Sequence, residues 1–204
     1  MLPIKSKYKI AKRLGAHIFP QTQTQKFALS EARTKKQKSH KRAGSDFSKQ
    51  LLEKQRVRYT YGLSERQLSN YAARAMKDPN PPQALHRAFE LRLDSVVYRA
   101  GFAHTRRSAR QSTSHGHFTV NGRRVTTPSF QLSLDDVVAV REGKTRASPL
   151  FSALTSNEGE DIRAIPSWLS VDISLLQTTV SSLPEYTQTE GGLEYPLVFE
   201  YYSR

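Results

Sequence analysis

The sequence predicts an α+β protein: a helical N-terminal domain, followed by a small domain in which two helices pack on a short, mainly antiparallel sheet. Two patterns support this fold class. Residues 45–100 carry apolar side chains at the spacing of α-helices. Residues 118–124 instead alternate apolar and polar side chains up to an Asn-Gly pair, which is typical of a hairpin.

Three helices are expected in the helical domain. The first begins after Ser45, a good N-cap residue, and ends at Gly62. Ser64 and Gln67 have the spacing of a capping box, which places the start of the second helix, and Pro79 helps to end that helix. The third is expected to be one helix with a core face of Leu85, Phe89, Leu93, Val96 and Val97.

The small domain should contain two short helices rich in arginine. Gly101 follows a helical apolar pattern at a position where the end of a helix favours positive φ. Thr105 stands where an N-cap is expected, directly before Arg106. Because Arg110 follows Arg106 by about one helical turn, the two side chains share a face and can follow a phosphate backbone.

A hairpin should follow, with Asn121 and Gly122 at its turn. Asn-Gly is a strong signal for a type I′ turn, because both central residues need positive φ. Arg123 and Arg124 come directly after the turn, and residues 137–140 form a further strand. Arginines at the start of a helix and at the tip of a hairpin could hold a folded RNA from two directions.

The charge of the chain is strongly basic and unevenly distributed. The formal net charge is +14, with the Lys/Arg excess before residue 147 and an acidic remainder after it. A polyanion is the natural partner of such a protein, and nucleic acid is the one favoured here. The absence of cysteine excludes disulfides and thiolate metal sites. No apolar run approaches the roughly 20 residues that a membrane-spanning helix needs.

Residues 1–44 mix Lys and Arg with Gln, Thr and Ser and show little apolar periodicity. They are interpreted as an extension that has no core of its own and becomes ordered on RNA. An amphipathic organelle-targeting sequence is the alternative, since no acidic residue occurs before Glu31.

No group of residues has the pattern of a catalytic site. Ser112, Ser114, His115 and His117 lie close in the sequence, but a nucleophilic site also needs an orienting acid placed by the fold. Their position favours RNA contact or turn capping. Asp94 lies between Arg92 and Arg99 and is expected to form a structural ion pair.

Several strings of residues occur in one order along the chain. Those at 92–99, 105–111, 114–116, 120–123 and 136–138 together resemble the αL RNA-binding motif, which is named after the small-subunit ribosomal protein S-four. Further segments, at 53–59, 61–63, 65–67, 166–169 and 200–204, resemble that ribosomal protein family itself. The resembling segments cover most of residues 45–204.

The resemblance implies a domain organisation. Residues 1–44 would be the basic RNA-binding extension, 45–90 the helical domain and 91–155 the αL domain. Residues 156–204 would pack back on the helical domain. The family often carries a four-cysteine zinc knuckle near its N-terminus, and this chain resembles the zinc-free form, with no metal or other cofactor.

The resemblance and the charge pattern together indicate a set of rRNA-binding residues. Five lie in the helical domain: Lys54, Arg56, Arg58, Tyr61 and Arg66. For Tyr61 the alternative is a position in the protein core. The others lie in the αL domain: Arg92, Arg99, Thr105, Arg106, Arg107, Arg110, Gln111, Ser114, His115, Asn121, Gly122, Arg123 and Arg124. The arginines of the αL domain are expected to face RNA and not the core.

The function implied is that of a structural constituent of the small ribosomal subunit, not an enzyme and not a membrane protein. Such a protein would bind a multi-helix junction in the 5′ domain of small-subunit rRNA, nucleate assembly of the subunit body and contribute to translational accuracy. Its partners would be ribosomal protein S-five and mRNA near the entry channel, on a cytoplasmic or organellar ribosome. The alternative is a stand-alone αL-motif RNA-binding factor of the ribosome-associated heat-shock type.

Overall fold

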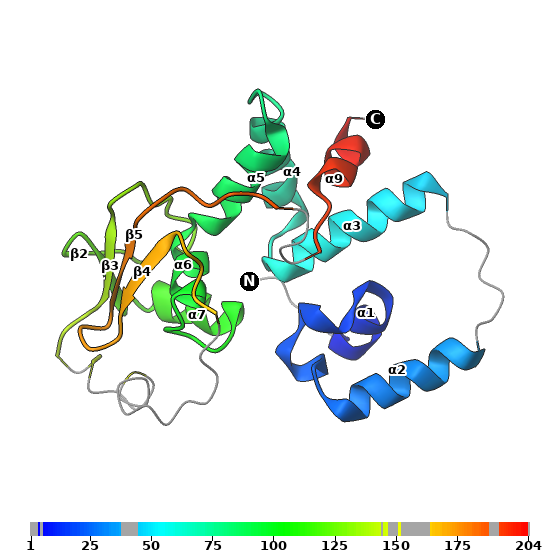
Figure 1. Ribbon diagram of the computed structural model, residues 1–204, viewed down its shortest axis with the longest axis horizontal. Helices are drawn as coiled ribbons and strands as arrows, with labels where there is room; N and C mark the ends of the chain where they lie inside the picture. Colours follow the sequence, from blue (N-terminus) through cyan, green and yellow to red (C-terminus); the bar gives the residue numbers. More distant parts are fainter. Residues whose placement is uncertain are drawn as a thin grey trace. The chain divides into compact units, whose positions relative to one another are not determined.

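The computed structural model describes residues 4, 6–37, 45–143, 145–146, 151, 164–187 and 192–203, and all that follows concerns these residues. The chain forms two compact units (Figure 1). The helical unit consists of Met1–Leu85 and Tyr186–Arg204, and the sheet unit consists of His86–Glu185. The α+β class predicted from the sequence is confirmed.

The helical unit begins with short elements around a small core. These are α1 (Lys7–Leu14), the 3-10 turns η1 (Ala16–Ile18) and η2 (Pro20–Thr22), and α2 (Gln25–Gln37). The core residues are Ala11, Leu14, Ile18, Phe19 and Phe27, with Leu52 and Tyr59 packed against them. The expectation of an extension without a core is therefore wrong for this stretch. The apolar residues come from several short elements, so no single period connects them in the sequence.

The next two helices, α3 (Asp46–Thr60) and α4 (Glu65–Ala75), begin and end as predicted. The Ser45 side chain accepts a hydrogen bond from the Ser48 N–H, and Gly62 has a φ of 62° after α3. Ser64 and Gln67 form the expected capping box at the start of α4. The C-terminal helix α9 (Tyr195–Tyr202) packs on α3 and α4.

The expected third helix is two helices in the structure, α5 (Pro81–Glu90) and α6 (Leu93–Arg99). Between them Arg92 has an extended backbone (φ −69°, ψ 140°) and forms an isolated β-bridge with Gln131. The neighbouring backbone groups join the same contact, since the Leu93 N–H donates to the Phe130 carbonyl at 2.9 Å. The single-helix prediction is wrong because this pairing with a distant segment overrides the local helical pattern.

The sheet unit combines α6 and α7 (Arg106–Ser114) with a five-stranded antiparallel sheet in the order β2-β1-β3-β5-β4. The strands are β1 (Phe118–Val120), β2 (Arg123–Arg124), β3 (Val137–Val140), β4 (Leu169–Asp172) and β5 (Gln177–Val180). One core cluster contains Val96 and Val97 of α6, Ala109 of α7, and Phe118 and Val138 of the sheet. The two helices therefore cover the sheet and bury a shared core (Figure 1).

The hairpin between β1 and β2 has the predicted turn. Asn121 has a φ of 49° and Gly122 a φ of 77°, as a type I′ turn requires. The Asn121 side chain also connects the hairpin to β3, because its amide donates to Asp136 Oδ1 at 2.7 Å and its carbonyl oxygen accepts the Val137 N–H at 2.9 Å. Asn121 thus has a structural role in addition to its place in the turn.

The end of the chain divides between the two units. Sequence analysis placed residues 156–204 with the helical domain, but β4 and β5 pair with each other and with β3 in the sheet unit. Trp168, Leu169 and Val180 are part of its core. The expectation is therefore wrong for Leu169–Val180, whereas α9 lies in the helical unit. The sheet unit is accordingly larger than the expected span of 91–155.

Candidate RNA-binding surface

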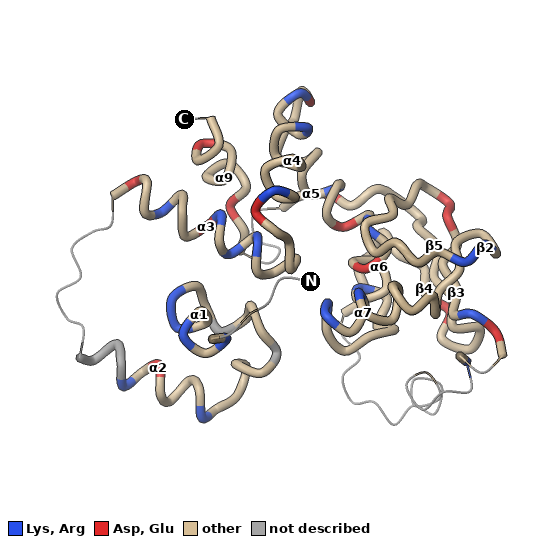
Figure 2. Tube along the Cα trace, turned by 180° about the vertical axis from the view of Figure 1, so that it is seen from behind, with Lys and Arg blue, Asp and Glu red and all other residues tan. Residues whose placement is uncertain are grey.

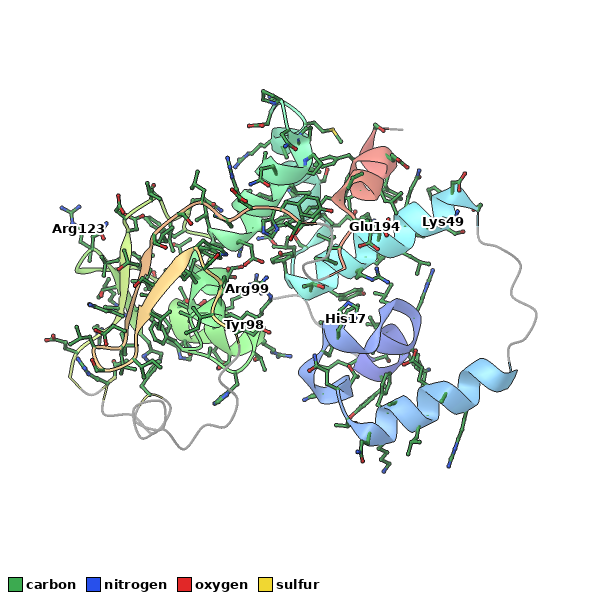
Figure 3. The ribbon with its side chains drawn as sticks, viewed as in Figure 1. His17, Lys49, Tyr98, Arg99, Arg123 and Glu194 are labelled. Atoms are coloured by element: carbon green, nitrogen blue, oxygen red, sulfur yellow. The ribbon has the colours of Figure 1, made fainter. Side chains whose placement is uncertain are left out.

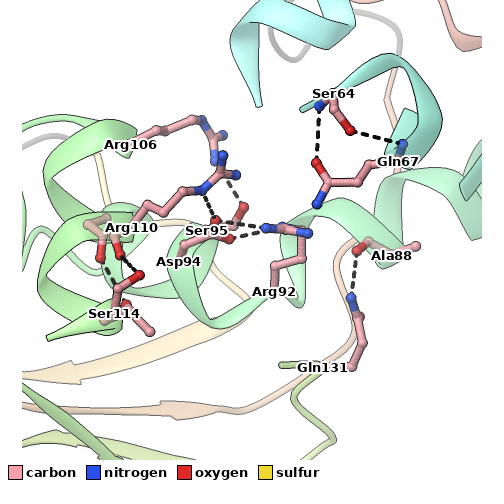
Figure 4. A network of polar contacts seen from close by, with 12 residues as sticks. Ser64, Gln67, Ala88, Arg92, Asp94, Ser95, Arg106, Arg110, Ser114 and Gln131 are labelled. Carbon is pink, nitrogen blue, oxygen red and sulfur yellow. Dashed lines mark hydrogen bonds and ion pairs between the residues drawn. The ribbon is translucent and has the colours of Figure 1, made fainter. Parts of the chain in front are cut away.

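A buried carboxylate on α6 holds two arginines in the sheet unit (Figure 4). Asp94 accepts hydrogen bonds from Arg92 Nε at 2.9 Å and from Arg92 Nη2 at 2.8 Å. Arg110 of α7 donates from Nε to the same carboxylate at 2.9 Å. Asp94 is only 4% exposed and Arg92 only 2%. The expected ion pair of Asp94 with Arg92 is confirmed, and Arg110 is its second partner.

Glu90, at the end of α5, binds a second pair of arginines. Arg99 donates from Nε and Nη2 at 2.8 and 2.9 Å, and Arg106 donates from Nη2 at 3.3 Å. Arg106 also donates to Ser95 Oγ at 3.1 Å and lies over the Tyr98 ring, 4.6 Å from its centroid. Burial alone raises the pKa of Glu90, but Arg106 and Arg99 outweigh it and hold the pKa well below its usual range. Glu90 is therefore ionised at neutral pH.

These contacts change the interpretation of the arginines predicted to bind RNA. The arginines of the αL domain were expected to face RNA and not the core, but Arg106 and Arg110 each pair with a buried carboxylate. The side chains of Arg99, Arg106 and Arg110 are 38%, 18% and 17% exposed, so each is partly accessible at the surface. Arg92 is buried and cannot reach RNA in this conformation.

Other predicted residues of the sheet unit are exposed. Arg107 and Gln111 are exposed on α7, and Arg123 is exposed on β2, where Figure 3 shows its side chain projecting from the hairpin. Arg107 and Arg123 form no ion pair with any residue that the structure describes. Thr105 acts as the N-cap of α7, as predicted, by accepting the Ser108 N–H at 3.0 Å. Arg107 and Arg123 therefore offer an anion positive charge that no described carboxylate compensates.

The predicted residues on and around α7 lie in two groups at opposite ends of that helix. Arg106 and Arg107 begin the helix, whereas Arg124 lies beyond its end and donates to the His115 carbonyl at 3.1 Å. A nine-residue helix is about 13 Å long. Ser114 is exposed at the second end, with its hydroxyl bonded to the Arg110 carbonyl at 2.9 Å.

Most of the predicted RNA-binding residues of the helical unit make contacts within the protein. Lys54 is buried and pairs with Glu65 at 2.8 Å, and Arg56 pairs with Glu53 at 2.8 Å. Tyr61 is also buried, with its hydroxyl 3.2 Å from the Tyr195 hydroxyl. Tyr61 therefore lies in the protein core, which was the alternative to RNA contact.

The remaining two predicted residues of this unit, Arg58 and Arg66, differ in their contacts within the protein. Arg58 donates to Gln55 Oε1 at 3.2 Å and lies 3.8 Å from a Glu65 oxygen. Burial alone raises the pKa of Glu65, but hydrogen bonds from Lys54 and Tyr202 outweigh it and lower the pKa. Arg66 alone of the five predicted residues is exposed and has no described ion pair.

Some exposed cations outside the predicted set lie on the first helices and after β3. The side chains on α1 and α2 are Lys9, Lys12, Arg13, Lys26 and Arg33, and Figure 2 shows basic residues along both helices. Arg141 follows β3 and is exposed. For the group on α1 and α2, the only sequence feature that could have predicted a binding surface is the high density of Lys and Arg before residue 37. For Arg141, no feature of the neighbouring sequence could have done so.

Neither a metal site nor a membrane-spanning helix is found in the part of the chain that the structure describes. None of its His, Asp and Glu side chains form a group of three or more that could hold a metal ion. No helix among the described residues is long and apolar enough to cross a membrane.

Comparison with known proteins matches both units. The family model for the S4 domain matches residues 91–138, and the model for the ribosomal protein S4/S9 N-terminal domain matches residues 4–87. The small ribosomal subunit protein uS4 of Corynebacterium kroppenstedtii is 45% identical over 161 residues, which are 78% of this chain and 79% of that protein. The uS4 proteins of a Nocardioides species and of Mycobacterium avium are each 43% identical over 161 residues, covering 78% of this chain and 78% and 79% of those proteins. Similarity of this extent, across both the helical unit and the sheet unit, means that the chain belongs to the uS4 family of small ribosomal subunit proteins.

Proposed function

We propose that this protein is a structural component of the small ribosomal subunit and binds the rRNA of that subunit directly. The observation that carries the proposal is the relationship to uS4 proteins over 78% of the chain. A protein of this kind holds and shapes RNA and catalyses no reaction. It acts in the ribosome, where its basic surface meets phosphate groups.

The surface of the sheet unit supports RNA binding on physical grounds. Arg107 and Arg123 carry charge that no described residue neutralises, so they can contribute most of their attraction to phosphate. Arg99, Arg106 and Arg110 are instead fixed by buried carboxylates. A guanidinium group that is already oriented loses less conformational entropy when it binds. The unit thus combines uncompensated charges with pre-organised ones.

We further propose an rRNA site and neighbouring partners, for which the family relationship is the support. The rRNA site would be the multi-helix junction of the 5′ domain, and binding there would nucleate assembly of the subunit body. The neighbouring partners would be ribosomal protein S-five and mRNA at the entry channel, with an effect on translational accuracy. The ribosome in question would be cytoplasmic. The alternative of a stand-alone heat-shock-type factor loses support because the match includes residues 4–87 outside the αL motif.

Co-sedimentation tests the proposal against that alternative. In a cell extract fractionated on a sucrose gradient, the chain should remain with the small subunit through a high-salt wash. Many simultaneous contacts hold a component of the assembled particle, whereas a factor held by a few surface ion pairs is released as salt screens them. Release of the whole chain to the top of the gradient would contradict a structural role.

A further inference from the structure

Four side chains that can carry positive charge converge at the C-terminal end of α7. His115 ends the helix and His117 directly precedes β1, with their ring centroids 5.8 Å apart. Arg124 of β2 donates from Nη2 to the His115 carbonyl at 3.1 Å. Arg141 follows β3; its backbone N–H donates to the His117 carbonyl at 2.8 Å, and its charge acts on the His117 imidazole. Segments far apart in the sequence thus place these groups together.

Gly116 allows the close approach of Arg124. The residue has a φ of 73°, and its N–H donates to the Thr113 carbonyl at 2.8 Å as α7 ends. A Cβ at this position would collide with the Arg124 side chain at Nε. The guanidinium group therefore crosses directly over the glycine, where any larger residue would displace it.

No Asp or Glu that the structure describes forms an ion pair with these four side chains. The groups that act on the His117 imidazole are His115 from the end of α7, Arg141 from the end of β3, and Arg124 from β2. Phe151 packs against the same imidazole, with ring centroids 6.1 Å apart. Glu142 follows Arg141 in the chain but forms no ion pair with a described residue. His115, Arg124 and Arg141 are exposed, so an anion can reach them.

We propose that His115, His117, Arg124 and Arg141 form a second phosphate-binding site for RNA, and that His117 takes up a proton when the phosphate binds. The proposal rests on the proposed function, because the ligand is a backbone phosphate of the same rRNA. The site is distinct from the arginines at the start of α7, which lie one helix length away. The two sites would hold the RNA backbone at two points.

The proton uptake follows from the surroundings of His117. Burial, reinforced by His115, Arg141 and Arg124, lowers the pKa of His117 in the free protein. A phosphate at the site adds negative charge, which favours the imidazolium form and raises that pKa. At a pH between the pKa of His117 in the free protein and its pKa in the complex, RNA binding is accompanied by the uptake of a proton. The affinity for RNA therefore rises as pH falls through this range.

The first experiment measures RNA affinity of the full chain between pH 5.5 and 8.5, using a 5′-domain rRNA fragment. Wild-type affinity should increase toward low pH, and His117→Gln should remove most of this pH dependence. Arg141→Gln should weaken binding by about tenfold at neutral pH, the scale of one charge-assisted hydrogen bond. If both variants bind RNA with the affinity and pH dependence of the wild type, the site is overturned while the proposed function stands. No RNA binding by the wild type would overturn both.

A matched pair of glycine variants tests the position of Arg124. Gly116→Ala and Gly101→Ala both place a Cβ on a residue of positive φ, 73° and 83°, after a helix of the sheet unit. The Cβ at residue 101 meets nothing within 4 Å, whereas that at residue 116 displaces Arg124. Thermal melting should therefore show similar losses of stability, while Gly116→Ala alone loses RNA affinity several-fold. Equal affinity of the two variants would contradict the site.

Discussion

Asp94→Asn is expected to lower the free energy of unfolding of the sheet unit by about 3–5 kcal/mol, the range for breaking a buried ion pair. The substitution keeps the shape of the side chain and removes its charge. Arg92, which is 2% exposed, would then keep a buried guanidinium group without the carboxylate that accepts two of its hydrogen bonds. Arg110 would lose the same partner.

This loss of stability can be measured by urea unfolding, with tryptophan fluorescence as the probe of the sheet unit. Trp168 is the only tryptophan of the chain and belongs to the core of the sheet unit. Glu142→Gln is the matched control, because it also removes one negative charge from the unit but at an exposed position. The control should stay within about 0.5 kcal/mol of the wild type. Similar midpoints for Asp94→Asn and the wild type would show that the buried pair does not support the fold.

The double variant Arg106→Ala/Arg110→Ala is expected to lose both RNA affinity and stability. Each effect should be about 1–3 kcal/mol, the scale of hydrogen bonds to charged groups. Sequence analysis expected these side chains to face RNA alone, but they also pair with Glu90 and Asp94. Removing them leaves both buried carboxylates with one cation fewer.

The pH dependence of unfolding separates this structural role from RNA binding. The pKa of Glu90 in the folded protein lies below its ordinary value of 4.5. Its contribution to stability is therefore complete above pH 4.5 and is lost as pH falls toward the folded value. Without Arg106 the folded pKa rises, so the double variant should lose less stability between pH 7 and pH 3 than the wild type.

A control for the double variant removes the same charge elsewhere. Arg74→Ala/Lys77→Ala takes two exposed cations from the helical unit, where neither forms a described ion pair. Its stability should be close to that of the wild type, and its loss of RNA affinity should be smaller. Equal losses of affinity in the two double variants would mean that diffuse charge, and not the surface of α7, holds the RNA.

Features set by short-range contacts could be predicted from the sequence. The caps at Ser45, Ser64 and Thr105 each need only a side chain and a backbone N–H three residues away. The turn at Asn121 and Gly122 likewise depends on the φ preferences of two adjacent residues. These elements begin and end where the local chemistry places them.

Features that depend on distant contacts could not be predicted. The break at Arg92 comes from pairing with Gln131, and strands β4 and β5 are held by pairing with β3. Short apolar stretches such as Leu169–Asp172 carry too few residues for their pattern to show which unit they join.

The binding surface shows the same division. An arginine that faces RNA and one that binds a buried carboxylate are the same residue type in the sequence. Arg106 and Glu90 are separated by 16 residues, as are Arg110 and Asp94, so their pairing depends on how the end of α5 and α6 lie against α7. Only the structure therefore distinguishes the internal arginines from the exposed Arg107 and Arg123.

The central claim is that exposed cations of the sheet unit bind rRNA through its phosphates. The most direct test is the dependence of affinity on salt, measured with the full chain and a 5′-domain rRNA fragment. If about five phosphates are neutralised, log K should fall with log salt at a slope of roughly −4 or steeper. Arg107→Ala/Arg123→Ala should make this slope shallower by about 2, because each arginine removed leaves one phosphate without its cation. A nearly salt-independent wild-type affinity, or an unchanged slope in the variant, would contradict the claim.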